Sequence, residues 1–506
     1  MGRVACTILH LGILTSTASA SEHRPTHDIH AQRVAALLAR VPVERRHRTA
    51  AGLASFYPTI APRSSSNLRI RPVDLGADPT GWRDSTFALQ QAVQSCVNRS
   101  KTSRNGEFPG WEDGWGPVRD AGGCFIDLEG GEYRISQSIE VPEMVANMQL
   151  GHGSIVADAQ TFQPGGFLLV IGVNGSCKFP QGSCNMDLNF PDIFLDGSNV
   201  ANGMQINNVM GTTIGPGGYF LNFTSCGVQI NAGHEVMMDR CWLGETNFDY
   251  KFALHGTKPK ATAVEINGND HYILNTIVFS SKIGIQVNGA ADVITGCHVW
   301  FPLNQALSFN DTMAFHTTRG GNRFTGCYAD GGRVVFEGQG LQRNFWTGGF
   351  ECCAAEGLEN VPHGVILRGD KIGPGLQIFN NIFNGGNIWH EPSRPGEVPT
   401  ICDTRITDNS NARTTQASQT LTQTSATIWH FDFCQELVFP LIASVRVSLQ
   451  TEEGFPRYIA RPAQNCSVLV ETDIAVTGRM TVDVDSASYT SSPAQRASLS
   501  TASVVV

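Results

Sequence analysis

Four titratable residues stand at similar distances behind three copies of a short repeated motif that ends in asparagine. Glu235, His271 and Asp292 each lie four residues after one of these asparagines, and Asp270 lies three residues after the second. If the repeats stack as coils of a parallel solenoid, equal offsets lie about 4.8 Å apart per coil. The spacing therefore predicts that the four side chains gather on one rim of the solenoid.

This group of side chains could catalyse hydrolysis by general acid–base chemistry. One carboxylic acid would protonate a leaving oxygen while another carboxylate activates water, and repulsion between them would raise one pKa into a useful range. Carboxyl groups one coil apart would lie about 5 Å apart and two coils apart about 9–10 Å. Inverting glycoside hydrolases use about 6.5–9.5 Å, and side-chain reach can close either gap. The alternative is that polar turn residues are simply solvated.

Basic residues near the repeats suit an acidic substrate. Three lysines precede two adjacent repeat strands on the rim opposite Glu235, and two arginines follow about two coils later. Glu265 faces outward on a repeat strand where a sugar could lie, although a solvated surface residue is the alternative. The candidate substrate-binding residues are Lys258, Lys260, Lys282, Arg323, Arg333 and Glu265.

Metal and cofactor motifs are absent from the sequence. It holds no CxxC pair or Cys/His spacing typical of structural zinc, and no Asp-x-Asp-x-Asp loop typical of calcium. We therefore predict that the protein uses neither a metal nor a cofactor.

The repeats themselves predict the architecture. The pattern small–apolar–any–apolar–Asn starts at Gly203, Gly227, Ala263, Gly284 and Ala306, with degenerate copies starting at Arg333 and Gly364. The start-to-start distances are 24, 36, 21, 22, 27 and 31 residues, and the shortest correspond to one turn of a parallel β-solenoid. The repeated Leu-x-x-Leu-x-Leu of leucine-rich repeats is absent. A second repeated pattern occurs at residues 238–241, 274–277, 295–298 and 324–327. In it we interpret Cys241 and Cys327 as small core residues, and we expect His298 to face the core.

Composition agrees with an all-β fold. The chain has 506 residues, of which only 16% are charged and 53 are glycine, so long helical bundles are disfavoured. A formal charge of −9 argues against a nucleic-acid partner. No later segment approaches the ~20 apolar residues of a membrane span. We expect an all-β protein, a parallel β-helix with an N-terminal capping helix and a small C-terminal β-rich appendage, acting as a monomer.

The N-terminal segment and the sequons indicate that the protein is exported. A basic start, an apolar run and Ala18-Ser19-Ala20 are typical of a signal peptide, and five Asn-x-Ser/Thr sequons agree with a secreted glycoprotein. The predicted segments are a signal peptide (1–20), an arm (21–66), an N-terminal cap (67–121), the β-helix (122–390), a linker (391–428), the appendage (429–485) and a flexible tail (486–506).

Fourteen cysteines become thirteen after signal removal, so at least one is expected to be free or intermolecular. Cys96 and Cys124 flank a long insert and could staple it. Cys177 and Cys184 bracket a short polar loop and could pair locally.

One stretch carries a family resemblance. Val73–Thr86, VDLGADPTGWRDST, looks like the N-terminal signature of pectate-lyase-superfamily β-helices. The chain further resembles the divergent quartet-type polygalacturonases, which separate pollen tetrads, in the stretches 123–128, 233–235, 266–270, 279–284 and 470–477. The resemblance implies a right-handed parallel β-helix that hydrolyses 1,4-galacturonan, an acidic cell-wall polysaccharide, outside the cell.

The catalytic motifs of the larger polygalacturonase family are missing. Its Asn-Thr-Asp, Asp-Asp, Gly-His-Gly and Arg-Ile-Lys motifs correspond here to residues 201–202, 225–226, 262 and 281–282, which hold other residues. Gly151-His152-Gly153 precedes the repeats and is interpreted as coincidence. Two alternatives to hydrolysis therefore stay open: a uronate lyase on the same scaffold, and a carbohydrate-binding β-helix without catalysis.

Overall fold

The computed structural model describes residues 68–99, 101–102, 118–172, 184–245, 260–301, 312–352, 364–395, 397, 399–452, 454–461 and 466–486. All of them belong to one compact unit, Asn67–Val506. The predicted signal peptide, the arm, Lys258 and nearly all of the predicted tail lie outside the described residues.

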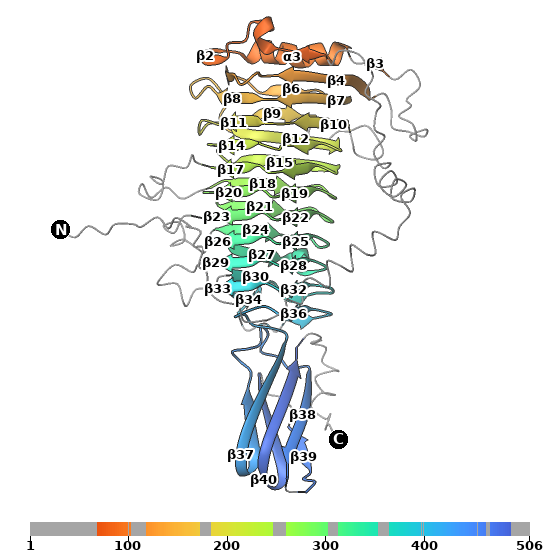
Figure 1. The fold of residues 1–506 in the computed structure, drawn as a ribbon, viewed down its shortest axis with the longest axis vertical. Helices are drawn as coiled ribbons and strands as arrows, with labels where there is room; N and C mark the ends of the chain where they lie inside the picture. The colour runs from red at the N-terminus through yellow and green to blue at the C-terminus, as the bar shows by residue number, and fades with distance from the viewer. Residues whose placement is uncertain are drawn as a thin grey trace, which may run out of the picture. The chain divides into compact units, whose positions relative to one another are not determined.

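The central part of the chain is a parallel β-helix, in which successive coils place their strands in three parallel ladders (Figure 1). The first ladder contains β6 (Ile139–Val141), β9 (Phe167–Ile171), β12 (Asn202–Met210), β15 (Cys226–His234), β18 (Thr262–Ile266), β21 (Ile283–Val287), β24 (Met313–Thr317), β27 (Arg333–Glu337), β30 (Gly364–Arg368) and β34 (Asn387–Glu391).

The second and third ladders continue the same coils. The second contains β1 (Arg69–Ile70), β4 (Arg119–Asp127), β7 (Val145–Gly151), β10 (Asn185–Phe190), β13 (Thr213–Ile214), β16 (Met237–Asp239), β19 (Tyr272–Leu274), β22 (Val293–Thr295), β25 (Arg323–Thr325), β28 (Phe345–Thr347), β32 (Gln377–Phe379) and β36 (Arg405–Thr407). The third contains β2 (Thr80–Asp84), β5 (Glu132–Ile135), β8 (Gly153–Ala157), β11 (Ile193–Asp196), β14 (Tyr219–Leu221), β17 (Trp242–Gly244), β20 (Ile277–Phe279), β23 (His298–Trp300), β26 (Tyr328–Asp330), β29 (Phe350–Cys352) and β33 (Ile382–Asn384). Short elements outside the ladders are η2 (Pro72–Leu75), β3 (Lys101–Thr102), η3 (Gly338–Leu341), β31 (Lys371–Ile372) and β35 (Thr400–Ile401).

The repeated asparagines form a continuous column along the first ladder. Asn231, Asn267 and Asn288 each donate a side-chain hydrogen bond of 3.0 Å to the asparagine one coil earlier, beginning at Asn207. The apolar residues of the repeats point inward and are fully buried, so one face of each strand supplies the core. The prediction of a parallel β-helix is confirmed.

One repeat copy was placed wrongly. The copy expected at Ala306–Asn310 lies outside the described residues, and the strand of that coil is β24, where Phe315 pairs with Ile285. Ala314 supplies the small residue eight positions later than expected, and Thr318 takes the place of the asparagine. The sequence pattern does not reveal this copy because it lacks the terminal asparagine.

The second repeated pattern places three cysteines in the core. Cys241, Cys297 and Cys327 are buried and free, which confirms the interpretation of the first and third. The expectation that His298 faces the core is wrong, because Cys297 occupies the inward position. His298 is partly exposed, and its ring stacks on Tyr328 at 4.3 Å.

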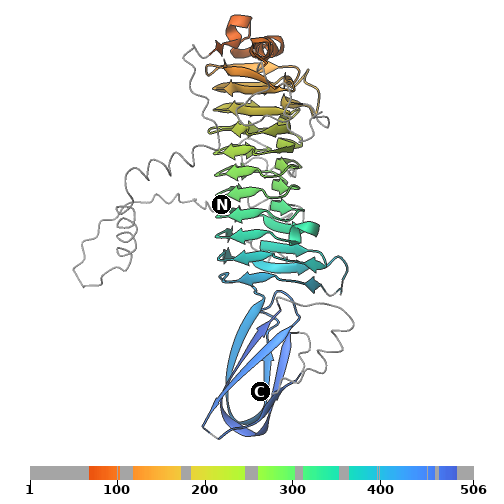
Figure 2. The same cartoon turned by 90° about the vertical axis from the view of Figure 1, so that its right-hand side faces the viewer.

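A single helix covers the N-terminal end of the β-helix (Figure 2). α3 (Thr86–Arg99) buries one apolar face, and the disulfide predicted between Cys96 and Cys124 is present. Cys184 is also disulfide-bonded, but Cys177 lies outside the described residues. Among the described helices, none is long and apolar enough to cross a membrane.

The C-terminal sheet follows the last coil and has its own core, which includes Trp429 and Phe431. Its strands are β37 (Gln416–Asp432), β38 (Ser444–Thr451), β39 (Tyr458–Ala460) and β40 (Ser467–Asp485). The linker expected over 391–428 is not present as such: this stretch contains β35, β36 and much of β37. The Thr, Gln and Ser residues of β37 form a strand with one exposed face, a conformation that threonine favours.

Candidate functional site on the first ladder

The structure brings two of the four predicted catalytic residues together on the rim of the first ladder. Glu235 and Asp270 lie on adjacent coils, where the backbone N–H of Glu235 donates to the carbonyl of Asp270 at 3.2 Å. The Asp270 carboxylate also lies 3.3 Å from the ring of His234, and both side chains are more than a third exposed. This rim group, Glu235, Asp270 and His234, can contact a solvent-borne ligand.

The other two residues are not on the rim. His271 and Asp292 are fully buried inside the turn, so their prediction as rim residues was wrong. The Nδ1 of His271 accepts the backbone N–H of Val236 at 3.1 Å, and Asp292 accepts the N–H of His271 at 2.9 Å. Asn322 accepts the N–H of Asp292 in the next coil. These side chains satisfy backbone donors that the turn would otherwise bury unpaired.

The error arose from one extra residue in a single turn. The carbonyls of Val236 and His271 accept equivalent bonds from the first strand residue of the next coil, so Val236 aligns with His271. Glu235 therefore aligns with Asp270, and both adopt the left-handed conformation, with φ of 53° and 61°. Equal offsets from the asparagines therefore match Glu235, which faces outward, with His271, which faces inward.

Burial sets the charge state of the two interior residues. Desolvation lowers the pKa of His271 to about 3 and raises that of Asp292 to about 7. Both side chains are thus neutral inside the coil at mildly acidic pH. Neither can exchange protons with a substrate in solvent, because neither reaches the surface.

The predicted substrate-binding residues are scattered. Lys260 and Lys282 are exposed just before β18 and β21, at the opposite strand ends from the rim group. Arg323 begins a strand of the second ladder instead. Glu265 faces outward from β18 and accepts the amide N–H of Gln229 at 2.9 Å.

A denser charged group lies farther along the first ladder, and we call it the charged row: Glu337, Arg368 and Glu391. By register these residues continue the asparagine column on β27, β30 and β34. Arg368 Nη1 lies 3.5 Å from Glu337, and its Nε lies 3.0 Å from Glu391. One guanidinium therefore bridges two carboxylates that stand two coils apart, all three side chains being 30–41% exposed.

Two further groups contact the charged row. The Nε2 of His316 lies 3.1 Å from Glu337, and burial lowers the pKa of this histidine although the carboxylate partly offsets the shift. Arg333, the one predicted binding residue in this region, is buried and lies 4.0 Å from Glu391. Beside the row, Val335 and Ile366 stand on the outward side of their strands and are nevertheless buried.

The charged row has the parts that general acid–base hydrolysis of an acidic sugar requires. Two coils correspond to about 9.6 Å of backbone separation, which is close to the 6.5–9.5 Å between the carboxyl groups of inverting hydrolases. Arginine also binds a carboxylate in a planar, bidentate manner. The signal was present in the sequence, because Glu337 and Arg368 stand where other copies carry asparagine. Glu391 fell one residue beyond the predicted end of the β-helix.

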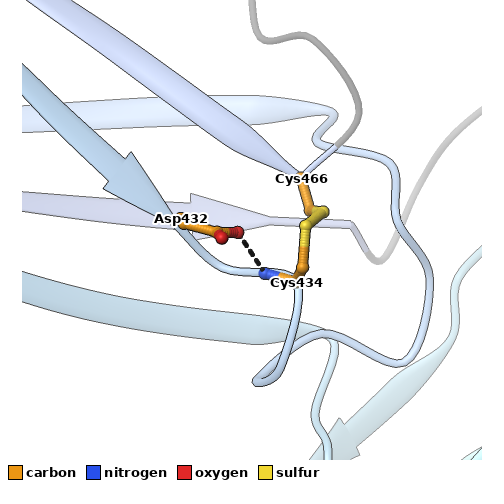
Figure 3. Close-up of side chains that lie close together, drawn as sticks. All are labelled: Asp432, Cys434 and Cys466. Atoms are coloured by element: carbon orange, nitrogen blue, oxygen red, sulfur yellow. Dashed lines mark hydrogen bonds between the residues drawn. A yellow bond between two sulfur atoms is a disulfide. The ribbon is translucent and has the colours of Figure 1, made fainter.

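One cluster has the residue types of a metal site without being one. Asp432, Cys434 and Cys466 lie within reach of a common ion (Figure 3). The two cysteines form a disulfide, however, and the Asp432 carboxylate accepts the backbone N–H of Cys434 at 3.0 Å. Oxidised sulfurs are not thiolate ligands, so this cluster stabilises a turn of the C-terminal sheet.

Comparisons with known proteins support the resemblance seen in the sequence. The chain is 26% identical to polygalacturonase QRT3 of Arabidopsis thaliana over 448 residues, covering 85% of this chain and 86% of that protein. Among solved structures, ORF18 of Geobacillus virus E2 aligns with a TM-score of 0.50 and 13% identity, covering 81% of this chain and 77% of that one. No family model matches. The viral protein shares the fold alone, whereas the plant protein confirms the resemblance to quartet-type polygalacturonases.

Proposed function

We propose that this protein is a secreted glycoside hydrolase that cleaves 1,4-galacturonan, an acidic cell-wall polysaccharide. The similarity to a named polygalacturonase over most of both chains supports the substrate class. The observation that carries the proposal is the charged row, in which one arginine bridges two partly exposed carboxylates that stand two coils apart on the sheet face. The signal-like N-terminus and the sequons support export.

In the proposed reaction, Glu337 and Glu391 act as the acid and the base. One protonates the glycosidic oxygen as the bond to the anomeric carbon breaks, and the other removes a proton from the attacking water. Arg368 binds the uronate carboxylate of the substrate, which then competes with the two glutamates for the guanidinium.

The rim group is the competing proposal. Glu235 and Asp270 are one coil apart, and about 5 Å between carboxyl groups is the spacing of retaining enzymes. Stereochemistry therefore separates the two sites. We expect the first product of polygalacturonate cleavage to appear with inverted anomeric configuration in proton NMR, because the charged row spans two coils. Retained configuration would contradict that assignment and select the rim pair.

The reaction type has its own test. Incubation with polygalacturonate should release reducing ends without a rise in ultraviolet absorbance, since hydrolysis creates no double bond. Absorbance at the unsaturated uronate band would identify a lyase instead. Alginate and neutral glucans serve as the other substrates of the panel, and no turnover on any of them would leave a carbohydrate-binding β-helix as the function.

A further inference from the structure

A polar cleft lies where the β-helix ends and the C-terminal sheet begins. Its two parts, of about 500 Å³ and 360 Å³, share Gln416 as a lining residue. All residues that line the first part are polar, and six of the eight that line the second are polar. The cleft is distinct from the charged row, because its lining residues come from β36, β37, β38, β40 and the segments beside β36 and β37, and none of them belongs to the row.

The backbone around the cleft is held by direct hydrogen bonds between the two substructures. Thr415 donates its N–H to Ile406 at 2.8 Å, and its carbonyl accepts the N–H of Ser486 at 2.8 Å. The last strand of the β-helix, the first strand of the sheet and the end of β40 therefore meet at one residue. A binding surface built on such fixed strands loses little conformational entropy when a ligand is bound.

The side chains in the first part contact one another. Arg405 Nε donates to the hydroxyl of Thr407 at 3.1 Å, and its Nη2 lies 3.4 Å from Asp408. The Thr407 hydroxyl donates to the same carboxylate at 2.9 Å, while the guanidinium lies over the Phe379 ring at 5.6 Å. In the second part, Gln416 donates its amide to Asp485 at 2.7 Å. Carboxylate acceptors beside guanidinium, hydroxyl and amide donors match a ligand with many hydroxyl groups.

The charge balance decides which kind of ligand this is. Asp403 and Asp408 stand against Arg405 in the first part, and Asp483 and Asp485 stand against Arg446 in the second. Each part thus carries two carboxylates and one guanidinium, a formal charge of −1. A polyanionic chain such as galacturonan would be repelled, so the favoured ligand is uncharged.

We propose that this cleft is a second glycan site, which binds a neutral polysaccharide chain and is separate from the hydrolytic site. It does not depend on the proposed function, since binding there involves no residue of the charged row. In a cell wall, such a site would hold the protein on a neutral polymer while the sheet face acts on an acidic one. Two linked sites raise the effective concentration of the second substrate.

Affinity electrophoresis of the full-length protein in gels with soluble β-1,4-galactan or polygalacturonate tests the proposal. Arg405→Ala and Asp483→Asn each change one part of the cleft at an exposed position. Arg479→Ala is the matched control, because Arg479 is exposed on the same sheet and does not line the cleft. We expect about tenfold weaker retardation by galactan for each cleft variant, the loss of roughly one charge-assisted hydrogen bond, and no change for the control.

Activity is measured in parallel on short galacturonan oligomers and should stay at the wild-type value in all three variants. The proposal is overturned if the wild type is not retarded by galactan, or if the control loses as much binding as the cleft variants. Weaker binding of polygalacturonate by the cleft variants would also overturn it, since that result assigns an acidic ligand to the cleft. Each outcome is read from binding and is independent of whether hydrolysis is found.

Discussion

Replacing Glu337 or Glu391 by glutamine is expected to lower kcat on polygalacturonate by about 10²- to 10⁴-fold, the usual contribution of a positioned acid or base. Glutamine keeps the size and one acceptor oxygen of glutamate but cannot exchange a proton. Because the amide can still face Arg368, substrate affinity should change much less than kcat. Initial rates of reducing-end release, measured for each variant over a range of substrate concentrations, give the two parameters separately.

The control for this pair is Glu140→Gln. Glu140 is an exposed glutamate on β6, the first strand of the same ladder, and many coils separate it from the charged row on β27, β30 and β34. It should keep wild-type kcat, and thermal melts of all three variants should coincide with that of the wild type. If Glu337→Gln and Glu391→Gln stay active while Glu235→Gln or Asp270→Asn abolish turnover, catalysis belongs to the rim group.

Some features of this molecule could be predicted from local sequence because they recur in every coil. The inward apolar residues and the asparagine column depend on the two-residue period of a strand, which the repeats display directly. Similar reasoning correctly assigned Cys241 and Cys327 to the core and paired Cys96 with Cys124. Side chains inside a strand alternate strictly between the two faces, so the sequence predicts correctly which of them point inward.

Turn positions are different, because a single inserted residue moves a side chain from the outside to the inside. The turn after β15 has one more residue than the next one, and this alone separated Glu235 from His271 and Asp292. The charged row was not predicted for a different reason, which concerns strands rather than turns. Its residues occupy strand positions that were counted as degenerate copies, although a charge in place of the ladder asparagine is itself the signal of a site.

The buried pair of His271 and Asp292 shows how a solenoid can hold two titratable groups without a net change in bound protons. The pKa of His271 falls to about 3 from 6.5, and that of Asp292 rises to about 7 from 3.8. At pH 5 the folded pair holds one proton, on Asp292, and the unfolded pair also holds one, on His271. Their contributions to the pH dependence of stability therefore oppose each other between about pH 4 and 6.5.

Single substitutions should reveal the two opposing slopes. Asparagine is the natural replacement, because Asn322 makes the same bond in the next coil. In Asp292→Asn only His271 remains, which the unfolded state protonates more readily, so stability should rise with pH between about 3 and 6.5. In His271→Asn only Asp292 remains, which the folded state keeps protonated, so stability should fall as pH rises from about 4 to 7.

For one proton, the free energy of unfolding can change by about 1.4 kcal/mol per pH unit. Across a pH window of about three units, set by the pKa difference between the folded and unfolded states, the change is about 4 kcal/mol. Urea unfolding at pH 4, 5, 6 and 7 measures it, and each variant is compared with the wild type so that other groups cancel. The double variant His271→Asn/Asp292→Asn should parallel the wild-type profile, because it also binds no proton on folding in this window. Single variants that run parallel to the wild type would mean that water reaches the interior of the turn and leaves both groups with ordinary pKa values.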